Sequence, residues 1–160
     1  MAEDLIKELG YLCLGSRFKR LGEQLQAGVE QSPLFGAPVP PGLFPLLAAL
    51  DRHDTLSITA LARILGVTQP GVTRSVGRLV AAGLVEISRT DRDQRQKMVG
   101  LTTAGRDLVD TSKRELWPRI EAAVRELCEG LNGNLLGQLA ALEDELARNP
   151  LNRRIAEANG

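Results

Sequence analysis

Cysteine, histidine and aromatic residues are scarce in this chain of 160 residues, which contains two cysteines, one histidine, one tryptophan, one tyrosine and three phenylalanines. Cys13 and Cys128 lie far apart and lack the spacing of a metal site, as expected of a reduced, intracellular protein. No glycine-rich phosphate loop and no G-x-S-x-G or C-x-x-C motif is present, and the single histidine, His53, is interpreted as a charge partner at a helix end. We therefore expect no enzymatic activity, no metal and no cofactor.

Long apolar runs are also missing. No stretch of about 18 apolar residues occurs, so no membrane span is expected, and the acidic start M-A-E-D-L lacks the apolar region of a signal peptide. We therefore expect a cytoplasmic protein.

Twenty basic and twenty acidic residues leave no net charge, which argues against a nonspecific polycation. The length favours a single domain over residues 1–160, and the many helix-forming residues favour a mainly α fold.

The first of two short, adjacent helices is predicted to begin after Ser57, which stands where an N-cap belongs. Ile58, Leu61 and Leu65 then recur at helical spacing and make one apolar stripe. Gly66 follows the last of them, where a left-handed residue commonly ends a helix. These signals predict a helix that stops at a tight turn.

A second helix is predicted to follow this turn directly and to end at Gly83. Thr68 stands at its N-cap, and Pro70 falls in the first turn, where a missing N–H costs nothing. One side is expected to be apolar, with Val72, Val76, Leu79 and Val80. The opposite side is expected to carry Pro70, Arg74, Gly77 and Arg78, a flat basic face of the kind that a DNA major groove admits.

Residues 84–88 and 97–101 are predicted to be strands of a hairpin with a polar tip that contains Arg89, Arg92 and Arg95. Residues 57–100 hold seven basic and three acidic residues, a net charge of +4, so the rest of the neutral chain carries −4. A balanced total therefore hides a positive block, which is typical of a phosphate-binding surface.

Four further helices are predicted on either side of this segment, over residues 3 to about 29, about 41 to 52, 103 to about 129 with a kink at Pro118, and about 132 to 148, closed by Pro150. Residues 31–42 form a proline-rich loop, and residues 149–160 are expected to be a frayed tail. The apolar stripes of residues 1–30 and 103–148 are too long for one small winged domain to cover. We therefore expect dimerisation helices that pair with a second copy, with a helix-lidded monomer as the alternative.

In combination these motifs resemble the MarR (multiple antibiotic resistance regulator) family. The resemblance lies in L-A-R-I-L-G-V-T-Q-P-G-V-T-R-S-V-G-R-L, in A-G-L-V, in the D-x-R at Asp93–Arg95 and in L-T-T-A-G, and it extends to the order of the flanking helices. It implies a mainly α fold with a small β-wing (α+β), in which a winged helix-turn-helix over residues 43–102 lies between dimerisation helices. The family wing often has an acidic residue and a proline where Thr90 and Asp91 stand, and an arginine where Gln94 stands.

The residues and the resemblance together predict a homodimeric, sequence-specific DNA-binding transcriptional regulator, a repressor relieved by a small aromatic effector. Its operator would be a pseudo-palindrome with half-sites about one turn, roughly 34 Å, apart. Arg74 and Arg78 are expected to reach base edges or phosphates, and Arg95 to enter the minor groove while Asp93 holds an arginine, as the family's D-x-R implies. The other expected DNA contacts are Thr68, Gln69, Pro70 and Thr73 at the helix start, and Arg92 and Lys97 in the wing.

Two alternatives stay open. Cys13, in Y-L-C-L-G-S-R, lies where the organic-peroxide-sensing branch of the family has a reactive cysteine, so a thiol-based peroxide-sensing regulator is one hypothesis. The tyrosine that activates the thiol in that branch is absent, although Tyr11 is near, and a cysteine that only packs is the competing interpretation. A winged-helix module that binds protein is the other hypothesis. Trp117, Phe18 and Phe44 are candidates to line an effector crevice, but with so few aromatic residues in the chain the core is the favoured interpretation.

Overall fold

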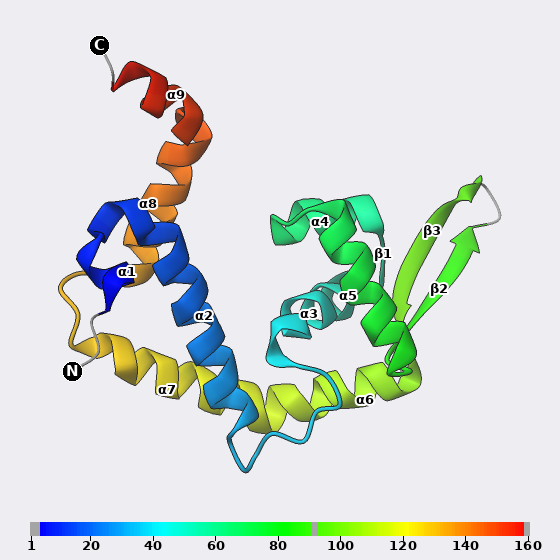
Figure 1. Ribbon diagram of the computed structural model, residues 1–160. Helices are drawn as coiled ribbons and strands as arrows, with labels where there is room; N and C mark the ends of the chain where they lie inside the picture. The colour runs from blue at the N-terminus through cyan, green and yellow to red at the C-terminus, as the bar shows by residue number, and fades with distance from the viewer. Residues whose placement is uncertain (1–3, 91–92, 159–160) are drawn as a thin grey trace. The chain divides into compact units, whose positions relative to one another are not determined.

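The computed structural model describes residues 4–90 and 93–158, without the side chains of residues 90 and 93–95. It divides into two compact units, Met1–Pro118 and Arg119–Gly160 (Figure 1). We describe each unit by itself. No helix of the described ranges is long and apolar enough to cross a membrane.

The first unit contains a winged helix-turn-helix. Its elements are α3 (Phe44–His53), β1 (Thr55–Ser57), α4 (Ile58–Leu65), α5 (Gln69–Ala81), β2 (Val85–Thr90), β3 (Asp93–Leu101) and α6 (Thr103–Thr111). The three strands form an antiparallel sheet in the order β1-β3-β2, in which Val99 is paired with Leu56 on one side and with Ile87 on the other. The mainly α fold with a small β-wing is therefore confirmed, whereas β1 was not predicted.

The side chains that were expected to point inward form the core of this segment. The largest fully buried ones are Leu47, Leu50, Leu61, Leu79, Leu101, Val72, Val76, Val99 and Val109. They come from α3, α4, α5, β3 and α6, and Val85 of β2 is buried in the same cluster. This shared core fixes α5 and the wing on one support.

The predicted caps of the two short helices are confirmed. The Ser57 hydroxyl accepts a hydrogen bond from the Ala60 N–H at 3.2 Å, and the Thr68 hydroxyl accepts one from the Gly71 N–H at 3.2 Å. Gly66 ends α4 with φ of 65°, a left-handed conformation that costs a glycine nothing. The turn between the two helices is therefore determined by residues within it.

The N-terminal region is not the single helix over residues 3–29 that its leucine spacing predicted. It consists of α1 (Leu5–Glu8), the 3₁₀-helix η1 (Gly10–Cys13) and α2 (Leu14–Glu30). Gly10, just after the C-cap of α1, has φ of 54°, outside the α-helical range, so an α-helix cannot continue through it. The Arg20 guanidinium donates a hydrogen bond to the Asp4 carboxylate at 3.0 Å and so ties α1 to α2. The loop expected over residues 31–42 ends early, in the 3₁₀-helix η2 (Pro41–Leu43).

The helix that was expected to kink at Pro118 changes its winding before the proline. A π-helical turn, η3 (Ser112–Leu116), links α6 to α7 (Trp117–Glu129). A proline has no N–H for the carbonyl four residues earlier, and a π-turn widens the helix so that the ring is accommodated. The helical backbone thus continues through Pro118.

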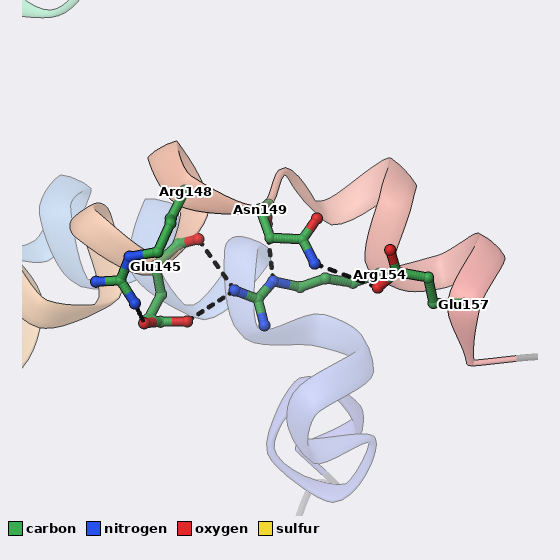
Figure 2. Close-up of polar contacts among 5 residues, drawn as sticks. All are labelled: Glu145, Arg148, Asn149, Arg154 and Glu157. Atoms are coloured by element: carbon green, nitrogen blue, oxygen red, sulfur yellow. Dashed lines mark hydrogen bonds and ion pairs between the residues drawn. The ribbon is translucent and has the colours of Figure 1, made fainter.

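The second unit contains α8 (Leu135–Arg148) and α9 (Leu151–Glu157), so the frayed tail predicted for residues 149–160 is wrong over α9. Arg154 donates hydrogen bonds to the Asn149 carbonyl at 2.8 Å, to the Glu145 carbonyl at 3.0 Å and to the Glu145 carboxylate at 2.9 Å (Figure 2). Arg148 also bonds to that carboxylate, and the Asn149 amide donates to Glu157. The Glu145 carbonyl already accepts a hydrogen bond from the Asn149 N–H at 3.0 Å, so Arg154 adds a second donor there and bonds to the Asn149 carbonyl beyond the helix end, and these bonds hold α9 in place.

Candidate nucleic-acid interface

The inner face of α5 attaches this helix to the core. Val72, Val76 and Leu79 are buried, as their spacing predicted. Val80 was expected on the same side but is 41% exposed, because it lies at the edge of the buried stripe near the end of the helix. The opposite face of α5 is therefore the one that the molecule presents to its surroundings.

That outward face carries Arg74 and Arg78, one helical turn apart and both exposed. Within the described residues neither guanidinium forms an ion pair, so both are available to an external anion. Thr73 and Gly77 beside them are exposed as well. A β-carbon added to Gly77 would meet nothing within 4 Å, so no neighbour in the described structure requires a glycine there.

The start of α5 offers further polar groups. Thr68, Gln69 and Pro70 are exposed, and the Thr68 hydroxyl, which accepts the cap hydrogen bond, still has its own proton to donate. Free N–H groups and the positive end of the helix dipole lie at the same place. The residues predicted at this end of the helix are thus brought together with Arg74 on one surface.

The wing is only partly described. Lys97 is exposed on β3 and is paired in register with Arg89 of β2, which is also exposed. Arg92 lies outside the described residues, as do the side chains of Asp93 and Arg95, so these three predicted contacts stay predictions. Arg89 was noted only as part of the hairpin tip. The strand register that places it opposite Lys97 makes it a further basic candidate of the wing.

α5 and the wing share an orientation within the first unit. In Figure 1, α5 runs from the α4–α5 turn down to the base of the hairpin, and β2 and β3 extend back in the upward direction. In that view, the N-terminal end of α5 and the ends of β2 and β3 remote from the α5–β2 corner lie toward the same side of the unit. A helix start and a hairpin with exposed basic residues are thereby presented together.

The candidate sensor residues lie elsewhere. Cys13 is a half-buried free thiol in η1, Cys128 is also a half-buried free thiol, and Tyr11 is exposed.

Phe44 and Trp117 are adjacent, with ring centroids 6.0 Å apart, and Phe35 packs on Phe44 at 6.3 Å. The indole N–H of Trp117 is buried without a partner among the described atoms. Phe18, on α2, is 43% exposed and does not join this cluster.

Within the described part of the chain, no metal site is found. His53 is the exposed last residue of α3, as its interpretation as a helix-end residue requires. Over the described residues, no group of three or more histidine, cysteine, aspartate or glutamate side chains is placed to hold a metal ion. The basic surface of α5 and the wing is therefore the site that the structure offers.

Comparison with known proteins agrees with this fold. Residues 39–96 match the model of the MarR family. A stretch of 70 residues is 33% identical to the "Uncharacterized HTH-type transcriptional regulator YdgJ" of Bacillus subtilis (strain 168). This match covers 44% of the chain and 43% of the relative, so the chain spans less than half the length of the curated relative that it matches.

Two solved structures share the architecture over most of the chain. A mutant of MarR from Escherichia coli, complexed with operator DNA, has a TM-score of 0.67 at 22% identity and covers 90% of this chain and 99% of its own. BpsR of Bordetella bronchiseptica, whose DNA binding is regulated by 6-hydroxynicotinic acid, has a TM-score of 0.64 at 23% identity and covers 84% and 92%. The family model, the curated relative and the shared fold agree with the sequence motifs: residues 39–96 are similar to the MarR family, and the chain has the winged helix-turn-helix fold of the two solved structures.

Proposed function

We propose that this chain is a homodimeric, sequence-specific DNA-binding transcriptional regulator that acts in the cytoplasm by binding and not by catalysis. The observation that carries the proposal is the division of α5 into a buried apolar face and an exposed face with two arginines, Arg74 and Arg78. A helix supported in this way suits insertion into a major groove, where arginine reads guanine edges bidentately.

Gly77 supports this assignment. A glycine in mid-helix costs about 1 kcal/mol relative to alanine. Nothing in the described structure is close enough to Gly77 to exclude a β-carbon, so packing within the chain does not explain its presence. Its smooth surface between Arg74 and Arg78 lets the helix backbone approach a large partner closely, as a DNA duplex requires.

The remaining contacts follow from position. We assign Thr68, Gln69, Pro70 and Thr73 to the phosphates and bases nearest the start of α5, where backbone N–H groups favour anions. We assign Arg92 and Lys97, together with Arg89, to phosphates beside the wing. Arg95 is the candidate for the minor groove, where a narrow groove attracts an arginine, and Asp93 is its positioning partner.

Dimer formation is inferred from the terminal helices. Phe18, Leu21 and Leu25 make an apolar stripe on α2 and are between 43% and 50% exposed, and Leu142 and Leu146 on α8 are 38% and 43% exposed. Apolar stripes of this length are what twofold-related helices cover in a dimer. Such a dimer would present two recognition helices to a pseudo-palindromic operator.

Regulation by a small molecule is the finer part of the proposal. One structural relative, BpsR, is described as regulated by 6-hydroxynicotinic acid, and another is a MepR-like protein complexed with pseudoligands. We propose a repressor that a small aromatic effector releases from DNA. Nothing around Cys13 favours the peroxide-sensing alternative, since Tyr11 is exposed.

The test is a titration of fluorescent duplexes with the purified protein. Duplexes selected by the protein from a random-sequence library serve as probes. Arg74→Ala and Arg78→Ala should each weaken binding by about 1–3 kcal/mol, roughly 5- to 150-fold, if they read bases. A residue that contacts a phosphate should instead reduce the slope of log K against log salt by about 0.9. Arg114→Ala, which removes an exposed arginine of η3, is the matched control. It should change neither the affinity for the duplex nor the salt slope.

Two outcomes would contradict the proposal. Selection that enriches no duplex, with salt-insensitive weak binding, would favour the winged-helix module that binds protein. Equal losses for Arg114→Ala and Arg74→Ala would show that general charge, and not the face of α5, carries the binding.

A further inference from the structure

The start of α6 is joined directly to the corner between α5 and β2. The Thr102 hydroxyl donates a hydrogen bond to the Gly83 carbonyl at 2.7 Å and accepts one from the Gly105 N–H at 3.0 Å. The Thr102 N–H donates to the Leu84 carbonyl at 3.0 Å. One threonine thus caps α6 and binds the corner through both its side chain and its backbone.

The corner directly follows α5, the proposed recognition helix, and is bonded back to its last turn. Gly83 has φ of 73° and follows the C-terminal residues of α5, and its N–H bonds to the Val80 carbonyl at 2.9 Å. Leu84 is buried, its N–H bonds to the Leu79 carbonyl at 3.0 Å, and Val85 begins β2. Thr102 therefore bonds to the segment where α5 ends and the wing starts.

Gly105 makes this junction a contact between backbones. A β-carbon added there would lie 2.0 Å from the Leu84 carbonyl oxygen and 3.0 Å from its carbon. These are backbone atoms, which cannot rotate away as a side-chain end can. α6 therefore lies against the corner with no side chain between them, and any larger residue at position 105 must push the two apart.

A second attachment fixes the other end of the same helical segment. The Lys113 ammonium group in η3 lies 2.5 Å from the Asp51 carboxylate on α3, and Val109 of α6 is fully buried in the core. α6 and η3 are thus held at the α5–β2 corner and at α3. Because both attachments are short, a change in the orientation of α6 must carry the end of α5 and the base of the wing with it.

We propose that Thr102 and Gly105 are positioning residues for DNA recognition: they hold α5 and the wing at a fixed orientation to α6 and so set the spacing of the two recognition helices in the dimer. This inference rests on the proposed DNA-binding function. It assigns to the L-T-T-A-G stretch a role in selecting half-site spacing, although none of its residues is a predicted DNA contact.

The experiment compares duplexes that differ only in half-site spacing. The probes are a duplex selected by the wild-type protein and the same duplex with one base pair inserted or removed between the half-sites. The wild type should prefer its own spacing by about tenfold or more, since a rigid dimer is geometrically matched to one separation. Thr102→Val, which removes the hydroxyl, and Gly105→Ala should reduce this preference to within about threefold. Thr102→Ser, which keeps the hydroxyl, should retain it.

The outcomes separate this role from fold stability and from the proposed function. Circular dichroism establishes that each variant is folded, and Thr102→Val keeps the test valid if Gly105→Ala does not fold. If Thr102→Val weakens binding to all spacings by the same factor, the positioning role is wrong while DNA binding stands. If the wild type selects no duplex, the proposed function and this inference both fail.

Discussion

Leucine-rich stripes at helical spacing occur in two regions of this molecule and have opposite outcomes. In the winged segment, Leu47, Leu50, Leu61 and Leu79 are at most 1% exposed. In α2, the same kind of stripe leaves Leu21 and Leu25 about half exposed, and no residue of α2, α8 or α9 is buried. The sequence pattern of the two regions is alike, so the difference lies in what each stripe meets.

This difference shows which region of the chain has a core of its own. The buried side chains of α3, α4, α5, β2, β3 and α6 pack in one cluster, so the winged segment has its own core. An isolated helix is marginal in water and takes most of its stability from packing of its apolar face. The terminal helices therefore depend on a surface that their own unit does not supply, and a second copy is the partner that we propose.

The largest expected effect is on the winged core. Leu79→Ala should lower the free energy of unfolding by about 2–5 kcal/mol, because the side chain is fully buried and its removal leaves a cavity. Leu136→Ala in α8 removes the same atoms from a side chain that is 77% exposed. It should change the free energy of unfolding by less than about 0.5 kcal/mol. Urea unfolding followed by circular dichroism, at equal protein concentration, measures both. Equal losses of unfolding free energy in Leu79→Ala and Leu136→Ala would contradict the proposed difference between the two regions.

The next effect concerns the terminal helices. Leu21→Asp should raise the dimer dissociation constant by about tenfold to a hundredfold, or roughly 1.4–2.8 kcal/mol, because it places a charge in the proposed interface. Ser16→Asp adds the same side chain on the opposite, exposed side of α2 and is the matched control. Analytical ultracentrifugation measures the constant. A Leu21→Asp protein that dimerises like the wild type would exclude α2 from the interface.

The smallest effect is the acid sensitivity of α9. The pKa of Glu145 is held below its ordinary value of 4.5, first by the hydrogen bond from Arg154 and then by the charge of Arg148. A lowered pKa in the folded state stabilises the α8–α9 junction above pH 4.5, and that stabilisation is lost as the pH falls through the folded value. The protection of α9 amides, measured as exchange relative to the intrinsic rate at each pH, should therefore fall below pH 4.5, and Glu145→Gln should lower this protection already at about pH 6.

A site-specific readout is needed for this last prediction. The pKa of Asp4 is also lowered, chiefly by its hydrogen bond from Arg20, so acid loosens the junction of α1 and α2 in the same direction. Exchange rates of α9 alone separate the two. Unchanged α9 exchange in Glu145→Gln would show that this carboxylate does not hold the C-terminal helix.

The sequence alone determined the parts of the molecule whose causes are local. Ser57, Gly66 and Thr68 define the helix-turn-helix because caps and left-handed glycines act within one turn of the chain. The faces of α5 follow from 3.6-residue periodicity, and the exposed positions of Arg74 and Arg78 were predicted on that basis. The positive block over residues 57–100 needed only a count of charges.

Only the tertiary structure decided what depends on residues far apart in the chain. β1 forms because Leu56 pairs with Val99, and nothing in T-L-S by itself predicts a strand. The N-terminal helix breaks at Gly10, and α9 is ordered by Arg154 acting on the end of α8. The junction of Thr102 and Gly105 with the α5–β2 corner joins residues about twenty positions apart. Periodicity specifies which face of a helix is apolar, but only packing specifies which surface meets it, because burial depends on neighbours that the local sequence does not contain.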